Sequence, residues 1–555
     1  MLAALLLVMS TPMAAEELSL DLAHAPFTLA RAAETFTPRS AREGALAVRL
    51  EGGLEDRPRK CGEVLFTVPP AWTARPWGNR ATLRAQVRVA AVFVGTGKRN
   101  WQQAHRARLF LEDRRGRRQY LPHIAIVDRP PATDGWLALG GRPTVDVPMP
   151  LGFTDAGFDP GHVAKVGLNV ESFNREGEEV AGAVELRDVT VSFGPPVKAA
   201  VLAPDPAVRA GEVKRAKQME ARWRERLGSR PFVTGVNLAW PSARSPDGDL
   251  MQLYGRYLDA GERWYDTLWD VGSPAVLEGL RADFREIRAL FGAPALVRVF
   301  LFGDLRAGVR FDDAGMPLAI TERAQENMGK LLAMAAQEKI VLLPALLDFT
   351  MADGRARSGP SGKWVGGEHL DLVTDPAKRA RLAGLLGDFV RAFAHHPAVL
   401  AWEVMNEPEN AAAAVTPEHF ADLQRLQIAV VDAIHAAGEL ATVGHRSLED
   451  AARFARGRVA SDLGQAHFYP LLDTRPNPTP FSARMGAAFG PLAAGWGEAQ
   501  ARPGKIAEQL EQARRAGHRY LLLWSWRGQE PSGDGFPVKP YGAEIGPVLR
   551  GERGP

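Results

Sequence analysis

The sequence predicts an α/β protein in which an all-β sandwich precedes a (β/α)8 TIM barrel. Three observations predict this. Residues 16–193 are short runs in which apolar and polar residues alternate, residues after 231 alternate apolar strands with helix-length segments, and eight such strands follow one another. With 555 residues, 46% of them hydrophobic and 24% charged, the chain has the composition of a globular protein with a large core.

The sandwich is expected over residues 16–196. Runs such as Ala45–Leu50, Ala81–Val89 and Val184–Phe193 have period two, and Gly, Pro or Asp residues separate them. Gly194-Pro-Pro196 then ends the pattern, and the charged segment from Ala207 to Leu227 is typical of a helix with one packed side. We therefore expect a helical linker over residues 197–229.

The barrel is expected over residues 230–555. Helical patterns separate the strand candidates, which gives eight β-then-α units. The strand candidates are Val233–Val236, Ala295–Phe300, Ile340–Leu347, Val399–Met405, Leu440–Val443, Leu463–Phe468, Leu492–Trp496 and Tyr520–Trp524. A doubly wound open sheet is the alternative, but it usually has a Gly-rich turn after its first strand, whereas Asn237–Pro241 has none.

The first 15 residues predict a signal peptide, because an apolar run is followed by small residues near Ala15. A buried N-terminal strand is the alternative, since no Lys or Arg precedes the run. We expect a secreted or periplasmic protein without a membrane span, and a monomer. The net charge of +3 does not favour nucleic acid, and the single cysteine, Cys61, excludes an internal disulfide and a Cys-based zinc cluster. No motif indicates a metal or another cofactor.

Two carboxylates are expected at the C-terminal rim of the barrel, where reactive groups of this fold lie. Glu407 follows the fourth strand in Asn406-Glu407-Pro408, and Glu498 follows the seventh in Gly497-Glu498. Two carboxylates facing each other across a cleft are what cleavage of a glycosidic bond requires, with a separation of roughly 5 Å in a retaining pair. We expect a raised pKa for Glu407, caused largely by the like charge of Glu498.

Other strand ends carry residues suited to bind a sugar. Asn237 ends the first strand, Arg298 lies in the second, His467 and Tyr469 follow the sixth, and Trp524 and Trp526 close the eighth. Cations and hydroxyls orient a carboxylate, and an indole ring can stack on a sugar. A structural ion pair within the rim is the alternative role for Arg298.

These motifs resemble the retaining glycoside hydrolases of clan A, most closely family 5, the cellulase-like family. The resemblance covers residues 231–549 and rests on the segment from His396 to Pro408, on His467-Phe-Tyr469-Pro470, on Gly497-Glu498 and on Trp524. It implies that Glu407 is the acid/base, that Glu498 is the nucleophile, and that Asn406 binds the sugar 2-hydroxyl. It also implies a hydrogen bond between Tyr469 and Glu498. The family often has a histidine where this chain has Asp348, and an aromatic residue where it has Ala499.

The sequence thus predicts an exported retaining hydrolase of β-glycosidic bonds, similar to an endo-β-glucanase or a mannanase, acting on a polysaccharide or an oligosaccharide. The sandwich is loosely similar to a carbohydrate-binding module and is expected to capture substrate or to brace the barrel. The alternative is a non-catalytic carbohydrate-binding or surface-assembly protein on a barrel scaffold.

Overall fold

The structure is a computed structural model in which the chain divides into two compact units, one ending at Lys198 and one spanning Ala199–Pro555. The residues that the structure describes are 16–22, 24–30, 36–42, 45–53, 59–74, 77, 80–94, 106–121, 124–125, 136–141, 153–154, 158–173, 179–194, 201–238, 274–303, 305, 308–352, 369–411, 419–468, 481–500, 506–526, 538–539 and 542–549. The predicted signal peptide and Tyr469 lie outside them.

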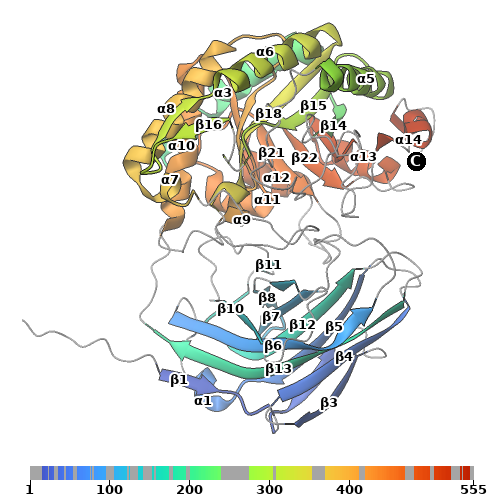
Figure 1. Ribbon diagram of the computed structural model, residues 1–555, viewed down its shortest axis with the longest axis vertical. Helices are drawn as coiled ribbons and strands as arrows, with labels where there is room; N and C mark the ends of the chain where they lie inside the picture. The colour runs from blue at the N-terminus through green and yellow to red at the C-terminus, as the bar shows by residue number, and fades with distance from the viewer. Residues whose placement is uncertain are drawn as a thin grey trace, which may run out of the picture. The chain divides into compact units, whose positions relative to one another are not determined.

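The first unit consists of two antiparallel sheets (Figure 1). One has the order β10-β6-β13-β4-β3, with β1 also paired to β13, and the other has the order β11-β8-β7-β12-β5-β2, with β9 also paired to β7. The strands are β1 Glu16–Ser19, β2 Phe27–Ala30, β3 Phe36–Arg42, β4 Ala45–Gly53, β5 Arg59–Thr67, β6 Ala81–Val94, β7 Arg106–Asp113, β8 Arg118–Tyr120, β9 Ile124–Ala125, β10 Leu137–Gly141, β11 Phe153–Thr154, β12 Val163–Phe173 and β13 Glu179–Phe193, and a short helix, α1, spans Pro70–Thr73.

The alternating sequence explains these sheets, because side chains along a strand point to opposite faces. In β6, Leu83, Ala85 and Val87 are buried while Arg84 between them is exposed. Long antiparallel strands with one apolar face form the predicted β domain.

The second unit is built on a sheet of eight parallel strands in the order β20-β19-β18-β15-β14-β23-β22-β21. Parallel bridges Thr442–Leu463 and His445–Ala466 join the two outer strands, β20 and β21, and close the sheet into a barrel. The strands are β14 Val233–Asn237, β15 Ala295–Phe300, β18 Ile340–Asp348, β19 Trp402–Asn406, β20 Ala441–Gly444, β21 Gly464–Phe468, β22 Ala494–Gln500 and β23 Tyr520–Trp524. The predicted fold class is confirmed.

Helices follow the strands and surround the barrel (Figure 1). They are α5 Pro274–Phe291, α6 Glu322–Gln337, α7 Asp371–Thr374, α8 Pro376–Ala392, α9 Pro408–Ala411, α10 Phe420–Ala436, α11 Leu448–Asp450, α12 Phe481–Phe489, α13 Ile506–Arg515 and α14 Gly542–Leu549, with a 3-10 turn at Phe349–Ala352, a π-helical turn at Ala451–Ala455 and a hairpin of β16 Val309–Phe311 and β17 Pro317–Ile320. No helix among the described residues is long and apolar enough to cross a bilayer.

The N-terminal end of the barrel is covered by helix α3, Glu212–Leu227, which follows the short helix α2, Pro206–Ala210. Met219, Trp223 and Leu227 of α3 belong to one apolar cluster with Leu296 and Leu522 of the strands. Arg222 also pairs with Glu439, just before β20, at 2.9 Å. The segment expected to be a linker is therefore a helix packed against the barrel and grouped with it in the second unit.

Candidate active site

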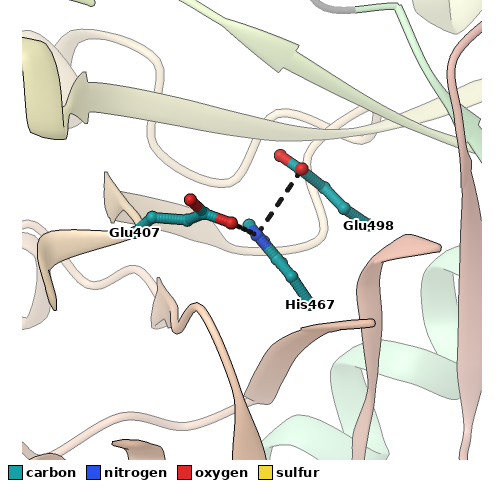
Figure 2. A group of neighbouring side chains, drawn as sticks. All are labelled: Glu407, His467 and Glu498. Carbon is teal, nitrogen blue, oxygen red and sulfur yellow. Dashed lines mark hydrogen bonds and ion pairs between the residues drawn. The ribbon is translucent and has the colours of Figure 1, made fainter. Parts of the chain in front are cut away.

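Glu407 and Glu498 lie at the C-terminal ends of strands, as the rim of a barrel requires. Glu407 comes directly after β19 with a positive φ of 42°, and its backbone N–H donates to the carbonyl of Gly444 at 2.7 Å. Glu498 lies in β22, directly beside His467 of β21 in the strand register. The three side chains converge on one point (Figure 2).

The distances within this triad are short. Nδ1 of His467 lies 2.8 Å from Oε1 of Glu407 and 3.6 Å from Oε2 of Glu498. One nitrogen or oxygen atom from each of the three residues lies within 4.8 Å of the others. Burial lowers the pKa of His467 to about 4, so that its ring is neutral near pH 7.

Arg298 of β15 holds the second carboxylate in place. Its Nη1 donates to Oε1 of Glu498 at 2.6 Å and to Oδ1 of Asn237 at 3.1 Å. Nε and Nη2 donate to the two carboxylate oxygens of Glu403, each at 2.6 Å, and Nη2 also donates to Oδ1 of Asn406 at 2.8 Å. A guanidinium has five N–H donors, and these five bonds use all of them.

The role of Arg298 follows from that count. Its side chain is fully buried, and it has no donor left for a substrate. The structure therefore supports the ion-pair alternative and corrects the prediction that Arg298 binds substrate. Asn237 is also fully buried, and its Nδ2 donates to the carbonyl of Gly497 at 2.9 Å. It ties the first strand to the seventh below the rim, so it too is a positioning residue.

Glu403 and Gln465 form a buried polar layer under the rim. Nε2 of Gln465 donates to Oε2 of Glu403 at 2.7 Å, and both side chains are fully buried. A Cβ atom on Gly444 would lie 2.4 Å from Oε1 of Glu403, so glycine is required for this close approach.

The pKa of Glu407 is raised to about 7, and the main cause is burial. Among nearby charges, Arg446 and Arg298 lower it, whereas Glu409 and Asp450 raise it. The expected direction is thus found, but the expected cause is corrected. Glu498 is not among the main contributors to the shift.

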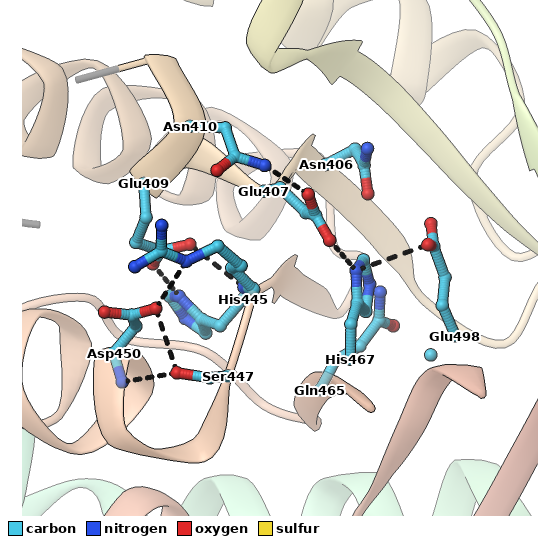
Figure 3. A network of polar contacts seen from close by, with 12 residues as sticks. Asn406, Glu407, Glu409, Asn410, His445, Ser447, Asp450, Gln465, His467 and Glu498 are labelled. Carbon is cyan, nitrogen blue, oxygen red and sulfur yellow. Dashed lines mark hydrogen bonds and ion pairs between the residues drawn. The ribbon is translucent and has the colours of Figure 1, made fainter. Parts of the chain in front are cut away.

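A second cluster of polar groups borders Glu407 on the side away from Glu498 (Figure 3). Glu409 of α9 contacts Nδ1 of His445 at 2.7 Å and accepts from the backbone N–H of Arg446 at 3.0 Å. Arg446 pairs with Asp450 at 2.9 Å, and Asn410 donates to Oε2 of Glu407. These contacts attach the turn that carries Glu407 to the end of the neighbouring strand β20.

The two predicted tryptophans differ in position. Trp524 ends β23 beside Phe300, with ring centroids 6.2 Å apart, and is 4% exposed. Trp526 is 2% exposed within the barrel's apolar core, and its Nε1 donates to Asp283 of α5 at 3.0 Å. The prediction that Trp526 binds substrate is therefore wrong, because a stacking platform needs a free ring face. The predicted contact of Tyr469 with Glu498 stays a prediction.

The triad of Glu407, His467 and Glu498 also has the spacing of a metal site. Such a site collects carboxylate and imidazole ligands around one cation. In this chain the guanidinium of Arg298 already lies 2.6 Å from Glu498 and supplies a positive charge there.

Sequence analysis missed the buried polar residues that position the site, namely Asp348, Glu403, Glu409, His445 and Gln465. One signal was present for each strand residue among them: an ionisable or amide side chain in an otherwise apolar barrel strand is costly to bury without a partner. The partners, however, lie far apart along the chain, with separations of 36 residues for Glu409–His445, 58 for Asp348–Asn406, 62 for Gln465–Glu403 and 105 for Arg298–Glu403.

No family model matches the chain, and neither does any curated protein sequence. Among solved structures it is similar to the β-1,4-D-mannanase of Cryptopygus antarcticus, with 18% identity and a TM-score of 0.43 over 58% of this chain and 91% of that one. It is also similar to the endo-1,4-β-mannanase of Eisenia fetida, with 19% identity and a TM-score of 0.40 over 58% and 91%. The corresponding values for the GH5_18 protein of Streptomyces cattleya are 18%, 0.41, 58% and 80%.

The fold and the site define a closed (β/α)8 barrel with two carboxylates and a neutral histidine meeting at the C-terminal ends of its strands.

Proposed function

We propose that this protein is a retaining glycoside hydrolase that cleaves β-glycosidic bonds of an oligosaccharide or polysaccharide. The observation that carries the proposal is the pair of carboxylates, which present oxygens within 4.8 Å of each other in two different environments. Retaining glycosidases have carboxyl groups about 5 to 5.5 Å apart, whereas inverting enzymes need about 6.5 to 9.5 Å to admit a water.

The two environments assign the two roles. Glu407, with a pKa of about 7, keeps its proton up to about that pH and can give it to the departing glycosidic oxygen. Glu498 is paired with Arg298 at 2.6 Å, which stabilises its negative charge and aims it across the mouth. Glu407 is therefore the acid/base, and Glu498 is the nucleophile.

The reaction then has two displacements. Glu498 attacks the anomeric carbon, the bond to the leaving oxygen breaks, and that oxygen takes the proton of Glu407. Glu407, now a carboxylate, removes a proton from water. The resulting oxygen attacks the same carbon, and Glu498 is released with the original anomeric configuration restored.

The finer parts of the proposal concern substrate and location. We propose an exported enzyme that acts on a β-glucan or a β-mannan, with the first unit capturing polymer or bracing the barrel. Asn406 is 4% exposed at the rim and is the candidate to bind the sugar 2-hydroxyl, and Trp524 closes the same rim. A panel of β-glucans, β-mannans and xylans tests the substrate class.

Two variants test the chemistry on aryl β-glycosides. Glu498→Ala should lower turnover at least about 10³-fold on every substrate, because no covalent intermediate can form. Glu407→Ala should keep the glycosylation step on dinitrophenyl glycosides, whose leaving groups need no proton, and azide should restore turnover as a β-glycosyl azide.

The matched control is Glu338→Ala. Glu338 is also a buried glutamate, paired with Arg285 and Arg288, but it follows α6 near the N-terminal end of β18. It should keep wild-type turnover. An α-configured first product by NMR, or equal loss on activated and unactivated substrates in Glu407→Ala without azide product, would contradict the assignment. Binding of glycans without any turnover would favour the non-catalytic alternative.

A further inference from the structure

Asp348 lies beside Asn406, the residue that we propose to bind the sugar 2-hydroxyl. It is the last residue of β18, and in the strand register it is paired with Asn406 of β19. Oδ2 of Asp348 accepts a hydrogen bond from Nδ2 of Asn406 at 2.8 Å. The carboxyl group is fully buried, so it cannot itself reach a substrate in the mouth.

The partners of Asn406 fix the orientation of its amide. An arginine only donates hydrogen bonds, so the amide oxygen must face Nη2 of Arg298, at 2.8 Å. A carboxylate only accepts, so the amide nitrogen must face Asp348. The reversed amide would place two donors against each other on one side and two acceptors on the other, which costs free energy at both contacts.

This orientation leaves Asn406 with one N–H donor and one oxygen lone pair for a ligand. In Figure 3 the Asn406 side chain lies next to Glu407 and faces the same space as Glu498. The remaining donor is thus held beside the two groups that would react with the anomeric carbon. The hydroxyl nearest to that carbon is the one on C2.

Asp348 is itself held in an accepting state on its other oxygen. Oδ1 accepts from the backbone N–H of Thr350 at 2.9 Å and from its hydroxyl at 2.7 Å. Burial raises the pKa of Asp348 to about 6, and the hydrogen bonds from Thr350 and Asn406 oppose that rise. Near pH 7 the group is a carboxylate.

We propose that Asp348 is a positioning residue that fixes the Asn406 amide, so that its free N–H recognises the hydroxyl next to the anomeric carbon. The proposal rests on the proposed glycosidase function. It assigns to Asp348 a role exerted only through Asn406, and this role has a consequence that a merely structural role lacks. Loss of Asp348 should matter for substrates with the 2-hydroxyl and not for substrates without it.

The experiment compares kcat/KM for an aryl β-glycoside and its 2-deoxy analogue at pH 7.5, in wild type and in Asp348→Asn. The asparagine has the same shape, but it can present a donor to Asn406. We expect the kcat/KM of the 2-hydroxy glycoside, divided by that of its 2-deoxy analogue, to fall about tenfold in the variant, as the loss of one hydrogen bond predicts. The kcat/KM of the 2-deoxy analogue itself should be nearly unchanged.

Four further variants complete the design. Asp348→Leu removes the acceptor without adding a donor and serves if Asp348→Asn does not fold. Asn406→Ala should lower the ratio similarly, and the double variant Asp348→Asn/Asn406→Ala should lower it no further, because both act on one contact. Thr350→Val is the matched control, since it removes a bond to Asp348 but leaves the Asn406 contact.

The outcomes separate this inference from the function on which it rests. If Asp348→Asn slows both substrates equally, Asp348 does not act through the 2-hydroxyl and the inference is overturned, while the glycosidase stands. Additive effects of the two single variants also overturn it. If wild type cleaves neither substrate nor any glycan, the proposed function fails, and this inference fails with it.

Discussion

At the scale of single residues, the site depends on how the charge of Glu407 is controlled. Burial raises its pKa, and charges on several elements adjust it. The groups with charge or a titrating proton around it are Arg298 of β15, Asp348 of β18, Glu409 of α9, His445 and Arg446 after β20, Asp450 of α11, His467 of β21 and Glu498 of β22. Glu409 is the buried carboxylate whose charge raises the pKa of Glu407 most directly.

We therefore expect Glu409→Gln to change the pH profile. A general acid must be protonated, so kcat/KM of wild type should fall as pH rises through about 7, the pKa of Glu407. Removing the charge of Glu409 leaves Arg446 less neutralised and lowers the pKa of Glu407. The alkaline limb should then move to lower pH, as measured with a substrate whose leaving group needs protonation.

The control uses the same variant with a dinitrophenyl glycoside, which needs no proton from Glu407. With that substrate the glycosylation step should show the same alkaline limb in Glu409→Gln as in wild type. With the substrate whose leaving group needs protonation, the alkaline limb of Glu409→Gln could instead stay in place or move to higher pH. Either result would show that the charge of Glu409 does not raise the pKa of Glu407.

Sequence alone predicts where Glu407 and Glu498 lie better than it predicts the residues that contact them. Glu407 and Glu498 follow strands at the rim, and the fold of those strands is readable from their apolar runs. The role of Arg298 is not readable, because it depends on whether the surrounding acceptors use all of its donors. Trp526 is two residues beyond a strand end, and nothing in its sequence neighbourhood shows that Asp283 pairs with its indole N–H.

At the scale of secondary structure elements, the barrel strands are predictable because a parallel strand is covered on both faces and reads as a continuous apolar run. Ile340–Asp348 is buried along its whole length. Strand boundaries are less predictable: β19 begins at Trp402, three residues after the expected start, because Val399 makes only an isolated bridge to Leu342. An apolar run marks where a strand lies but does not show where its ladder begins.

His518, between α13 and β23, should make the folded protein less stable at acidic pH. It is 3% exposed, neither ring nitrogen has a hydrogen-bond partner among the described residues, and its ring lies 4.5 Å from that of Trp496. Burial lowers the pKa of His518 to about 4. The folded state therefore disfavours the charged ring, and the unfolded state takes up the proton first as pH falls.

His518→Phe should remove this weakness. In wild type the stabilising effect of a neutral His518 is complete above pH 6.5 and is lost as pH falls from there toward 4, which amounts to about 2 kcal/mol at pH 5. Urea titrations give the free energy of unfolding of the variant minus that of wild type at each pH. This difference should be larger at pH 5 than at pH 7.5 by about that amount. Equal differences at the two pH values would contradict the assignment.

At the scale of the whole molecule, the division into two units determines which part of the chain should fold alone. The second unit begins at Ala199 and thus includes α2 and α3. Helix α3 supplies Met219, Trp223 and Leu227 to the apolar layer that fills the N-terminal end of the barrel. The sequence predicts a helix in this segment, but its many charged residues do not indicate how much of the barrel core it contacts.

A pair of truncations tests this dependence. The chain 199–555 keeps α3 and should fold and turn over an aryl β-glycoside, whereas the chain 230–555 lacks Met219, Trp223 and Leu227. Exposing the cavity that they fill should cost roughly 5 kcal/mol or more, comparable to the whole stability of many proteins, so we expect little soluble 230–555. Soluble yield, thermal melting and turnover measure the outcome.

If 230–555 melts and reacts like 199–555, α3 is not part of the barrel core. If 199–555 is itself insoluble, the first unit is needed to brace the second. If 199–555 folds and cleaves the aryl β-glycoside but no longer cleaves polymer, the first unit captures substrate.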